Sequence, residues 1–165
     1  MALAPAITDL EQLKSHPALA CLLGWNPASV EGAKFDREEM TIYAGRAYLR
    51  EACMLLKNDP TCDFSYLSDV TCVDWLPEEP RFEVIYHLFS IAKKERVRLK
   101  VRLSGDSPAI ESITSIWPGA NYGEREVYDL FGVRFTGHPY LRRLLMPEDW
   151  EGHPLRKDYP VEGYR

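Results

Sequence analysis

The clearest pattern of apolar and polar positions lies in residues 96–103, where apolar and basic residues alternate strictly. The apolar positions are Val97, Leu99, Val101 and Leu103. A period of two predicts a β-strand with one face in a core and the other in solvent. The preceding segment, Phe82–Ile91, is apolar on both faces, as expected of a central strand. The short link through Lys93-Lys94 therefore predicts an antiparallel hairpin.

The rest of the chain predicts interleaved helices and strands. Further strands are expected at Val30–Phe35, Met40–Tyr43 and Phe64–Asp74. Helices are expected from the capping box Thr8–Glu11 to near Gly24 with a break at His16-Pro17, from about Ala47 to Lys57, and from Ser107-Pro108 through Trp117. Because the hairpins require antiparallel pairing, we predict an α+β fold, in which helices pack a mixed, largely antiparallel sheet.

Residues 121–131 predict one more helix. Asn121 is the expected N-cap, Glu124 its capping-box partner, and Gly132 the residue that ends the helix. Taken alone, the carboxylates in this run are typical either of a solvated helix face or of a catalytic cluster.

Helical spacing separates the charged residues of this run. Arg125 and Asp129 share a face, so they are expected to pair with each other. Glu126 shares its stripe with apolar Leu130, and a carboxylate there would need a partner such as an arginine at an interface.

The chain beyond Leu145 has almost no apolar periodicity but many arginine, aromatic and proline residues. These residue types dominate binding hot spots, and proline lowers the entropy lost on docking. Candidate anchors are Arg142, Arg143, Trp150, Arg156, Tyr159 and Tyr164. We predict a globular domain over residues 1–145 and an extended partner-binding tail over 146–165, the alternative being a tail that wraps its own domain.

Composition narrows the function classes. The 165 residues are 45% hydrophobic, enough for one globular domain with a core, and the net charge of −5 argues against nucleic acid as a partner. No apolar run is long enough to span a bilayer, and the start lacks a signal-peptide pattern, so a soluble chain is expected.

Motifs for chemistry are not apparent in the sequence. The four cysteines, Cys21, Cys53, Cys62 and Cys72, form no C-x-x-C pair, so we expect reduced thiols and no zinc or iron–sulfur site. The histidines are scattered, and there is no nucleophile elbow, glycine-rich phosphate loop or dinucleotide fingerprint. No catalytic, cofactor-binding or metal-binding residue is assigned.

Two motifs resemble a known family. The run E-R-E-V-Y-D-L-F at 124–131, followed by His138 and Arg142, resembles the signature of the thirty-kilodalton subunit of respiratory complex I, known in bacteria as the C subunit. The tail P-E-D-W-E-G-H-P-L-R-K-D-Y-P at 147–160 is similar to the C-terminal segment of that family. The resemblance extends to Arg81–Ser90 and Trp117–Asn121.

The resemblance implies a non-redox subunit in the peripheral arm of the proton-translocating NADH:quinone oxidoreductase. FMN and iron–sulfur clusters would lie in partner subunits, and this chain would bind no cofactor. It would pack against the forty-nine-kilodalton-type (49 kDa) subunit on the cytoplasmic side of a bacterial plasma membrane, touching the membrane only through the complex. The implied signature and interface residues are Glu124, Arg125, Glu126, Asp129, His138, Arg142, Arg143, Trp150, Arg156, Lys157 and Tyr159.

Two alternatives remain at this point. The nearer is an equivalent subunit of a membrane-bound hydrogenase or another quinone-reducing complex. The more distant is a free-standing small enzyme that uses Glu124, Glu126 and Asp129 as acid/base groups.

Overall fold

A computed structural model describes residues 5–163 of the chain, so the expected anchor Tyr164 lies outside the described residues. The chain divides into two compact units. The first unit contains the chain up to Ser68 together with Tyr86–Val101. The second unit contains Asp69–Ile85 and the chain from Arg102 onward.

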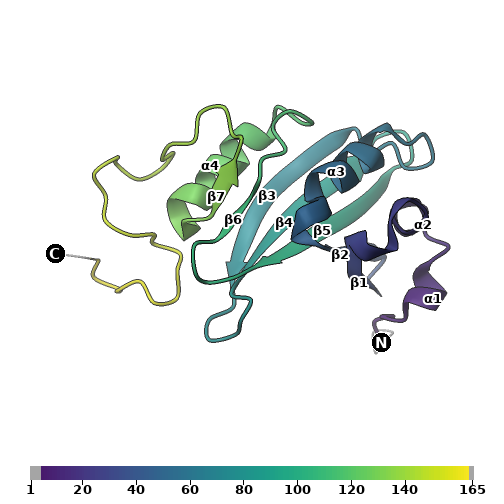
Figure 1. Cartoon of the computed structure of the whole chain (residues 1–165), viewed down its shortest axis with the longest axis horizontal. Coiled ribbons are helices and arrows are strands. Elements are labelled where there is room, and N and C mark those ends of the chain that lie inside the picture. Colours follow the sequence, from purple (N-terminus) through teal and green to yellow (C-terminus); the bar gives the residue numbers. More distant parts are fainter. Residues whose placement is uncertain (1–4, 164–165) are drawn as a thin grey trace. The chain divides into compact units, whose positions relative to one another are not determined.

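The elements follow one another as interleaved helices and strands (Figure 1). The helices are α1 (Leu10–Leu13), α2 (Pro17–Trp25), α3 (Leu49–Asn58) and α4 (Ala120–Phe131), with short 3-10 turns η1 (Pro27–Ser29) and η2 (Arg46–Tyr48). The strands are β1 (Val30–Asp36), β2 (Glu39–Ala44), β3 (Tyr66–Asp74), β4 (Phe82–Ser90), β5 (Glu95–Leu103), β6 (Ala109–Glu111) and β7 (Arg134–Thr136). Within residues 5–163, no helix has the length and apolar character needed to cross a membrane.

The strands form one sheet in the order β1-β2-β5-β4-β3 and a separate pair of β6 with β7. β1 and β2 are antiparallel, whereas β2 and β5 are parallel, as are β6 and β7. The expected α+β fold with a mixed sheet is therefore confirmed.

The expected hairpin is also confirmed. β4 and β5 are neighbours in the sheet and are joined by the turn at residues 91–94, so they run antiparallel. The four alternating apolar side chains of β5 are buried at 0–2% exposure, while Arg98 and Lys100 stay partly exposed.

The first unit builds its core from α2, α3 and β1. Asp9 caps α1 by accepting a hydrogen bond from the Glu11 amide, and Pro17 opens α2 after the break that the sequence predicts. α2 contacts both α3 and β1. Leu19 and Leu56 are completely buried in this core.

One expected helix is replaced in the second unit by a strand and turns. Residues 109–111 form strand β6, and residues 113–117 form turns, instead of the helix predicted from Ser107 to Trp117. The amides of Arg134 and Ser112 donate to the carbonyls of Pro108 and Thr136, extending the pairing of β6 with β7. The apolar spacing at 110, 113 and 117 is equally satisfied by a short strand followed by a tight turn.

α4 ends as predicted but begins differently. Gly132 ends the helix in the left-handed conformation with φ 75°, where glycine carries no Cβ penalty. The N-cap is Gly119, without a side-chain cap, and not Asn121. Glu124 cannot complete a capping box because its carboxylate accepts hydrogen bonds from Ser112 and Ile113.

We expect Leu99→Ala to lower the free energy of unfolding by roughly 2–5 kcal/mol, because Leu99 is completely buried. The matched control is Met54→Ala on α3, whose side chain is 43% exposed, and it should change stability by less than about 1 kcal/mol. Urea unfolding of both variants measures the difference. Equal losses would contradict the burial of β5.

Candidate functional site: the C-terminal segment bound to α4

The described C-terminal segment, residues 146–163, contains no helix or strand and lies against the end of α4. The last carbonyls of a helix have no partners within it. Those of residues 129, 130 and 131 accept hydrogen bonds from His153 Nδ1 (2.8 Å), the Leu155 amide (3.0 Å) and Arg156 Nε (2.6 Å). Because a carbonyl only accepts, His153 Nδ1 carries the proton. The segment thus caps the helix, and the Arg156 charge suits the negative end of its dipole.

Gly132 makes this approach possible. A Cβ added there would lie 2.5 Å from Arg156 Nη2 and 2.5 Å from His153 Nε2. Glycine is therefore required both for the backbone conformation and for the space that the segment occupies.

Asp129 fixes the chain just before this segment. Its side chain is fully buried, and Oδ1 accepts a hydrogen bond from Arg143 Nη1 at 2.7 Å. Oδ2 accepts from the backbone amides of residues 144, 145 and 146 at 2.9, 2.7 and 2.9 Å. Burial alone would raise the pKa of Asp129, but these hydrogen bonds outweigh it and lower the pKa below its ordinary value.

Two arginines extend the network along the backbone. Arg143 Nη2 donates to the carbonyls of Trp150 (2.7 Å) and Gly152 (3.0 Å). Arg125 donates to the carbonyls of residues 142 and 143 at 3.2 and 3.0 Å. The predicted pairing of Arg125 with Asp129 is wrong, because each of the two side chains instead holds residues 142–146.

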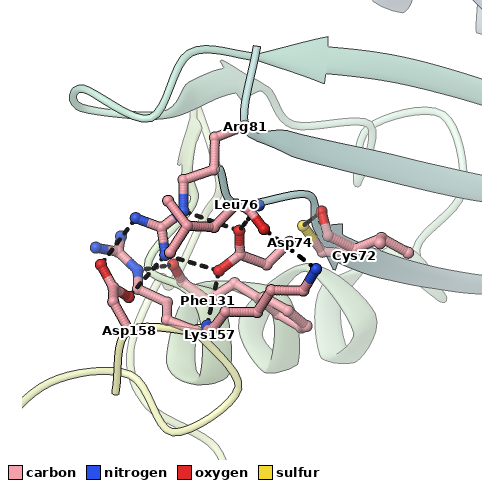
Figure 2. Close-up of polar contacts among 9 residues, drawn as sticks. Cys72, Asp74, Leu76, Arg81, Phe131, Lys157 and Asp158 are labelled. Carbon is pink, nitrogen blue, oxygen red and sulfur yellow. Dashed lines mark hydrogen bonds and ion pairs between the residues drawn. The ribbon is translucent and has the colours of Figure 1, made fainter. Parts of the chain in front are cut away.

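A second network holds the segment at the turn between β3 and β4 (Figure 2). Arg81 points between two carboxylates and donates to both oxygens of Asp74 (2.8 and 2.7 Å) and of Asp158 (2.9 and 2.7 Å). Asp74 also accepts from the backbone amides of Leu76 and Lys157. Hydrogen bonding to Arg81 holds the pKa of Asp74 well below its usual range.

Glu124 sits in a separate buried site. Its Oε2 accepts from the Ser112 hydroxyl at 2.6 Å, and Oε1 accepts from the Ile113 amide at 2.7 Å. Burial raises its pKa to about 7, although both hydrogen bonds act in the opposite direction. The group ties the start of α4 to the chain after β6.

Four other predicted residues face solvent: Glu126, Arg142, Trp150 and Lys157. Glu126 therefore does not need the buried partner that its helical stripe suggested. The Arg142 guanidinium lies 4.4 Å from the ring centroid of Tyr140. Trp150 is 38% exposed, and four more large aromatic or apolar side chains of α4 and the chain after it are exposed: Tyr122 (66%), Tyr140 (57%), Leu145 (61%) and Leu155 (52%).

The last two predicted residues, His138 and Tyr159, are half-buried. His138 Nε2 lies 3.3 Å from the Asn121 carbonyl, and its Nδ1 accepts a hydrogen bond from the Tyr140 amide. His138 thus fixes the loop after β7 against the start of α4.

The structure groups Arg125, Asp129, Arg143 and Arg156 into one anchoring network, whereas the family resemblance implies a signature and interface role for them. It also adds residues that were not among the implied signature and interface residues: Asp74, Arg81, His153 and Asp158. Arg81 and Asp158 are 77 positions apart, and no local pattern links them. The only signal was that both lie in stretches similar to the family.

The model of the family described as "Respiratory-chain NADH dehydrogenase, 30 Kd subunit" matches residues 42–165. The chain belongs to this family. The match includes the whole anchoring network and confirms the resemblance seen in the two motifs.

Curated relatives agree with this family. The C subunit of the NADH-quinone oxidoreductase of Roseiflexus sp. (strain RS-1) is 47% identical over 135 residues, covering 82% of this chain and 78% of the relative. The corresponding NADH-quinone oxidoreductase protein of Geobacter sulfurreducens is 45% identical over 137 residues, with 82% and 83% covered.

Two solved structures are also similar. A chain of the membrane-bound sulfane sulfur reductase, an archaeal respiratory membrane complex, matches with a TM-score of 0.75 at 27% identity, covering 90% of this chain and 86% of that one. A trypsin-resistant fragment of Nqo5 matches with a TM-score of 0.54 at 30% identity, covering 62% and 83%.

We expect Gly132→Ala to lower stability by roughly 1–2 kcal/mol through left-handed strain alone, and additionally to displace His153 and Arg156. Hydrogen exchange should then accelerate at the Leu155 and Lys157 amides. Gly137→Ala is the matched control, since Gly137 has φ 80° but nothing within 4 Å of an added Cβ. Equal exchange at these amides in the two variants would contradict the role of Gly132 in docking.

Glu124 should make stability depend on pH. Its pKa is about 7 in the folded chain, against an ordinary value of 4.5, so the unfolded chain releases the proton first. The free energy of unfolding should therefore fall by roughly 3 kcal/mol as pH rises from 4.5 to 7, and it should level off above pH 7. Urea unfolding at pH 5 and pH 8 should show this loss in the natural chain and not in Glu124→Gln. The same pH dependence in the natural chain and in Glu124→Gln would refute the assignment of this loss to Glu124.

Proposed function

We propose that this chain is a non-redox subunit of a proton-translocating NADH:quinone oxidoreductase. In such an enzyme, electrons pass from NADH through FMN and iron–sulfur clusters of partner subunits to quinone. The family match over residues 42–165 and the names of the curated relatives support this role. The acid/base enzyme is disfavoured because Glu124 and Asp129 are fully buried and hydrogen-bonded within the chain.

The exposed side chains around α4 and the C-terminal segment are the surface that we assign to a partner. This assignment rests on one observation: the exposed side chains stand on a backbone that the anchoring network holds in place. A segment without regular structure holds Trp150 and Leu155 outward because its backbone is bonded to Arg143 and α4. A surface fixed in advance loses less conformational entropy when a partner binds.

The partner that we propose is the forty-nine-kilodalton-type subunit within the peripheral arm. The arm would lie on the cytoplasmic side of a bacterial plasma membrane, and this chain would reach the membrane only through the complex. Its contribution to electron transfer would be to hold the redox subunits in place. Aromatic and arginine side chains such as Trp150 and Arg142 are of the types enriched at such contacts.

A second candidate is the equivalent subunit of a different respiratory complex. It is favoured by the TM-score of 0.75 with a chain of the archaeal membrane-bound sulfane sulfur reductase. Purification of the native complex separates the candidates. Flavin- and NADH-binding subunits that co-purify with this chain support the oxidoreductase, whereas a hydrogenase-type or sulfur-reducing partner set supports the second candidate.

We expect Trp150→Ala to weaken incorporation of the chain into its membrane complex at least tenfold, as loss of a binding hot spot does. Trp25→Ala is the matched control, because Trp25 is similarly exposed (42% against 38%) but lies on α2. The fraction of each variant that sediments with the detergent-extracted complex, together with NADH:quinone activity, measures the effect.

Thermal melting of both purified variants separates assembly from folding. Trp150→Ala should keep the melting temperature of the natural chain, since its side chain is exposed. Normal incorporation and activity in Trp150→Ala would overturn the assigned surface without changing the family assignment.

A further inference from the structure

Three metal-ligating side chains meet in the first unit. Cys21 lies on α2, Asp59 is the C-cap of α3, and Cys62 follows in the next turn. Their ligand atoms all lie within 4.8 Å of one another. The sequence predicts no metal site because no cysteines are closely spaced, but Cys21 and Asp59 are 38 positions apart and only the fold brings them together.

The separation of the donor atoms suits a tetrahedral cation. Cys21 Sγ lies 3.5 Å from Asp59 Oδ2. A zinc ion with ordinary bond lengths of about 2.3 Å to sulfur and 2.0–2.2 Å to oxygen places such atoms about 3.6 Å apart. The two side chains could bind one ion without rearrangement of the backbone.

The Asp59 carboxylate is held in the orientation that a ligand needs. Its Oδ1 accepts hydrogen bonds from the amide (2.8 Å) and the hydroxyl (2.5 Å) of Thr61, which leaves Oδ2 directed at Cys21. The Cys62 amide donates to the Asp59 carbonyl at 3.0 Å, so the D-P-T-C run forms a tight turn with both ligands on it. Hydrogen bonds of this kind orient metal ligands in known sites.

Access and charge also favour a cation. Cys62 is buried at 1% exposure, whereas Cys21 is partly exposed and leaves a path for an ion and a water molecule. The carboxylates of Asp59 and Glu95 both act on the Cys62 thiol, adding negative potential to the cluster.

We propose that Cys21, Asp59 and Cys62 bind a divalent cation of the zinc class through two thiolates and one carboxylate oxygen, with water as the fourth ligand. Two thiol protons pass to solvent when the ion binds. Sulfur ligands select zinc-like ions over magnesium or calcium, which prefer oxygen alone. The ion would tie the end of α3 to α2 and stabilise the first unit.

The test is a titration of the full, chelator-treated chain with Co²⁺ in the presence of a phosphine reductant. We expect a thiolate-to-cobalt charge-transfer band that saturates at one equivalent and disappears when Zn²⁺ is added. Zn²⁺ should also raise the melting temperature of the natural chain, since an ion bound only by the folded state stabilises it.

Two variants keep the fold and remove one ligand each. Cys21→Ser changes a partly exposed thiol, and Asp59→Asn retains Oδ1 for Thr61; each should weaken Co²⁺ binding at least tenfold. Cys72→Ala, a buried cysteine of the second unit, is the control and should bind as the natural chain does. Absence of the band, unchanged affinity in both ligand variants, or its loss in Cys72→Ala would each overturn the proposal.

Discussion

The buried carboxylate of Asp129 is the constraint on which the second unit depends. A charge taken out of water costs several kcal/mol unless every oxygen finds partners. Asp129 finds them in the Arg143 guanidinium and the amides of residues 144–146, so the chain after β7 must return to α4. Nη2 of the same Arg143 donates to the carbonyls of residues 150 and 152. This contact places His153 and Arg156 next to the last carbonyls of α4. One buried charge therefore fixes the first part of the segment, up to residue 152.

The contact between Arg81 and Asp158 follows the same logic at a second place. Arg81 donates to buried Asp74 through Nε and Nη2, and its Nη1 together with the shared Nη2 makes a second bidentate contact with Asp158 that lysine geometry cannot reproduce. The unit thus contains dense charged motifs whose role is to hold its own backbone. Such groups contribute little net stability compared with apolar packing. Loss of one partner, however, leaves the other as an uncompensated buried charge, and this cost holds the segment in a single position.

How much the sequence predicts depends on the range of the interaction. The alternation in residues 96–103 predicts β5 correctly because a period of two is local and one face is buried. The strand at 109–111 was missed because its partner, 134–136, lies beyond α4 in the chain. The capping-box prediction was wrong because Glu124 accepts hydrogen bonds from Ser112 and Ile113. The Asp59–Cys62 turn gives no sign of a metal site in the sequence, because Cys21 lies 38 positions before Asp59 and only the fold brings the two together.

The C-terminal segment is predicted to be an extended partner-binding tail, and the hydrogen bonds of residues 153–158 show that it also binds α4 and Arg81 of its own unit. Removal of residues 146–163 would strip three carbonyl caps from α4, free Arg81 from one of its carboxylates, and delete Trp150 and Leu155 at once. A truncated chain that failed to assemble would therefore not distinguish an unfolded unit from a lost interface. The two roles belong to different groups: the backbone and the charged side chains of Arg143, Arg156 and Asp158 bind within the unit, and the exposed Trp150 and Leu155 side chains face outward. Only single changes at the exposed positions report on binding alone.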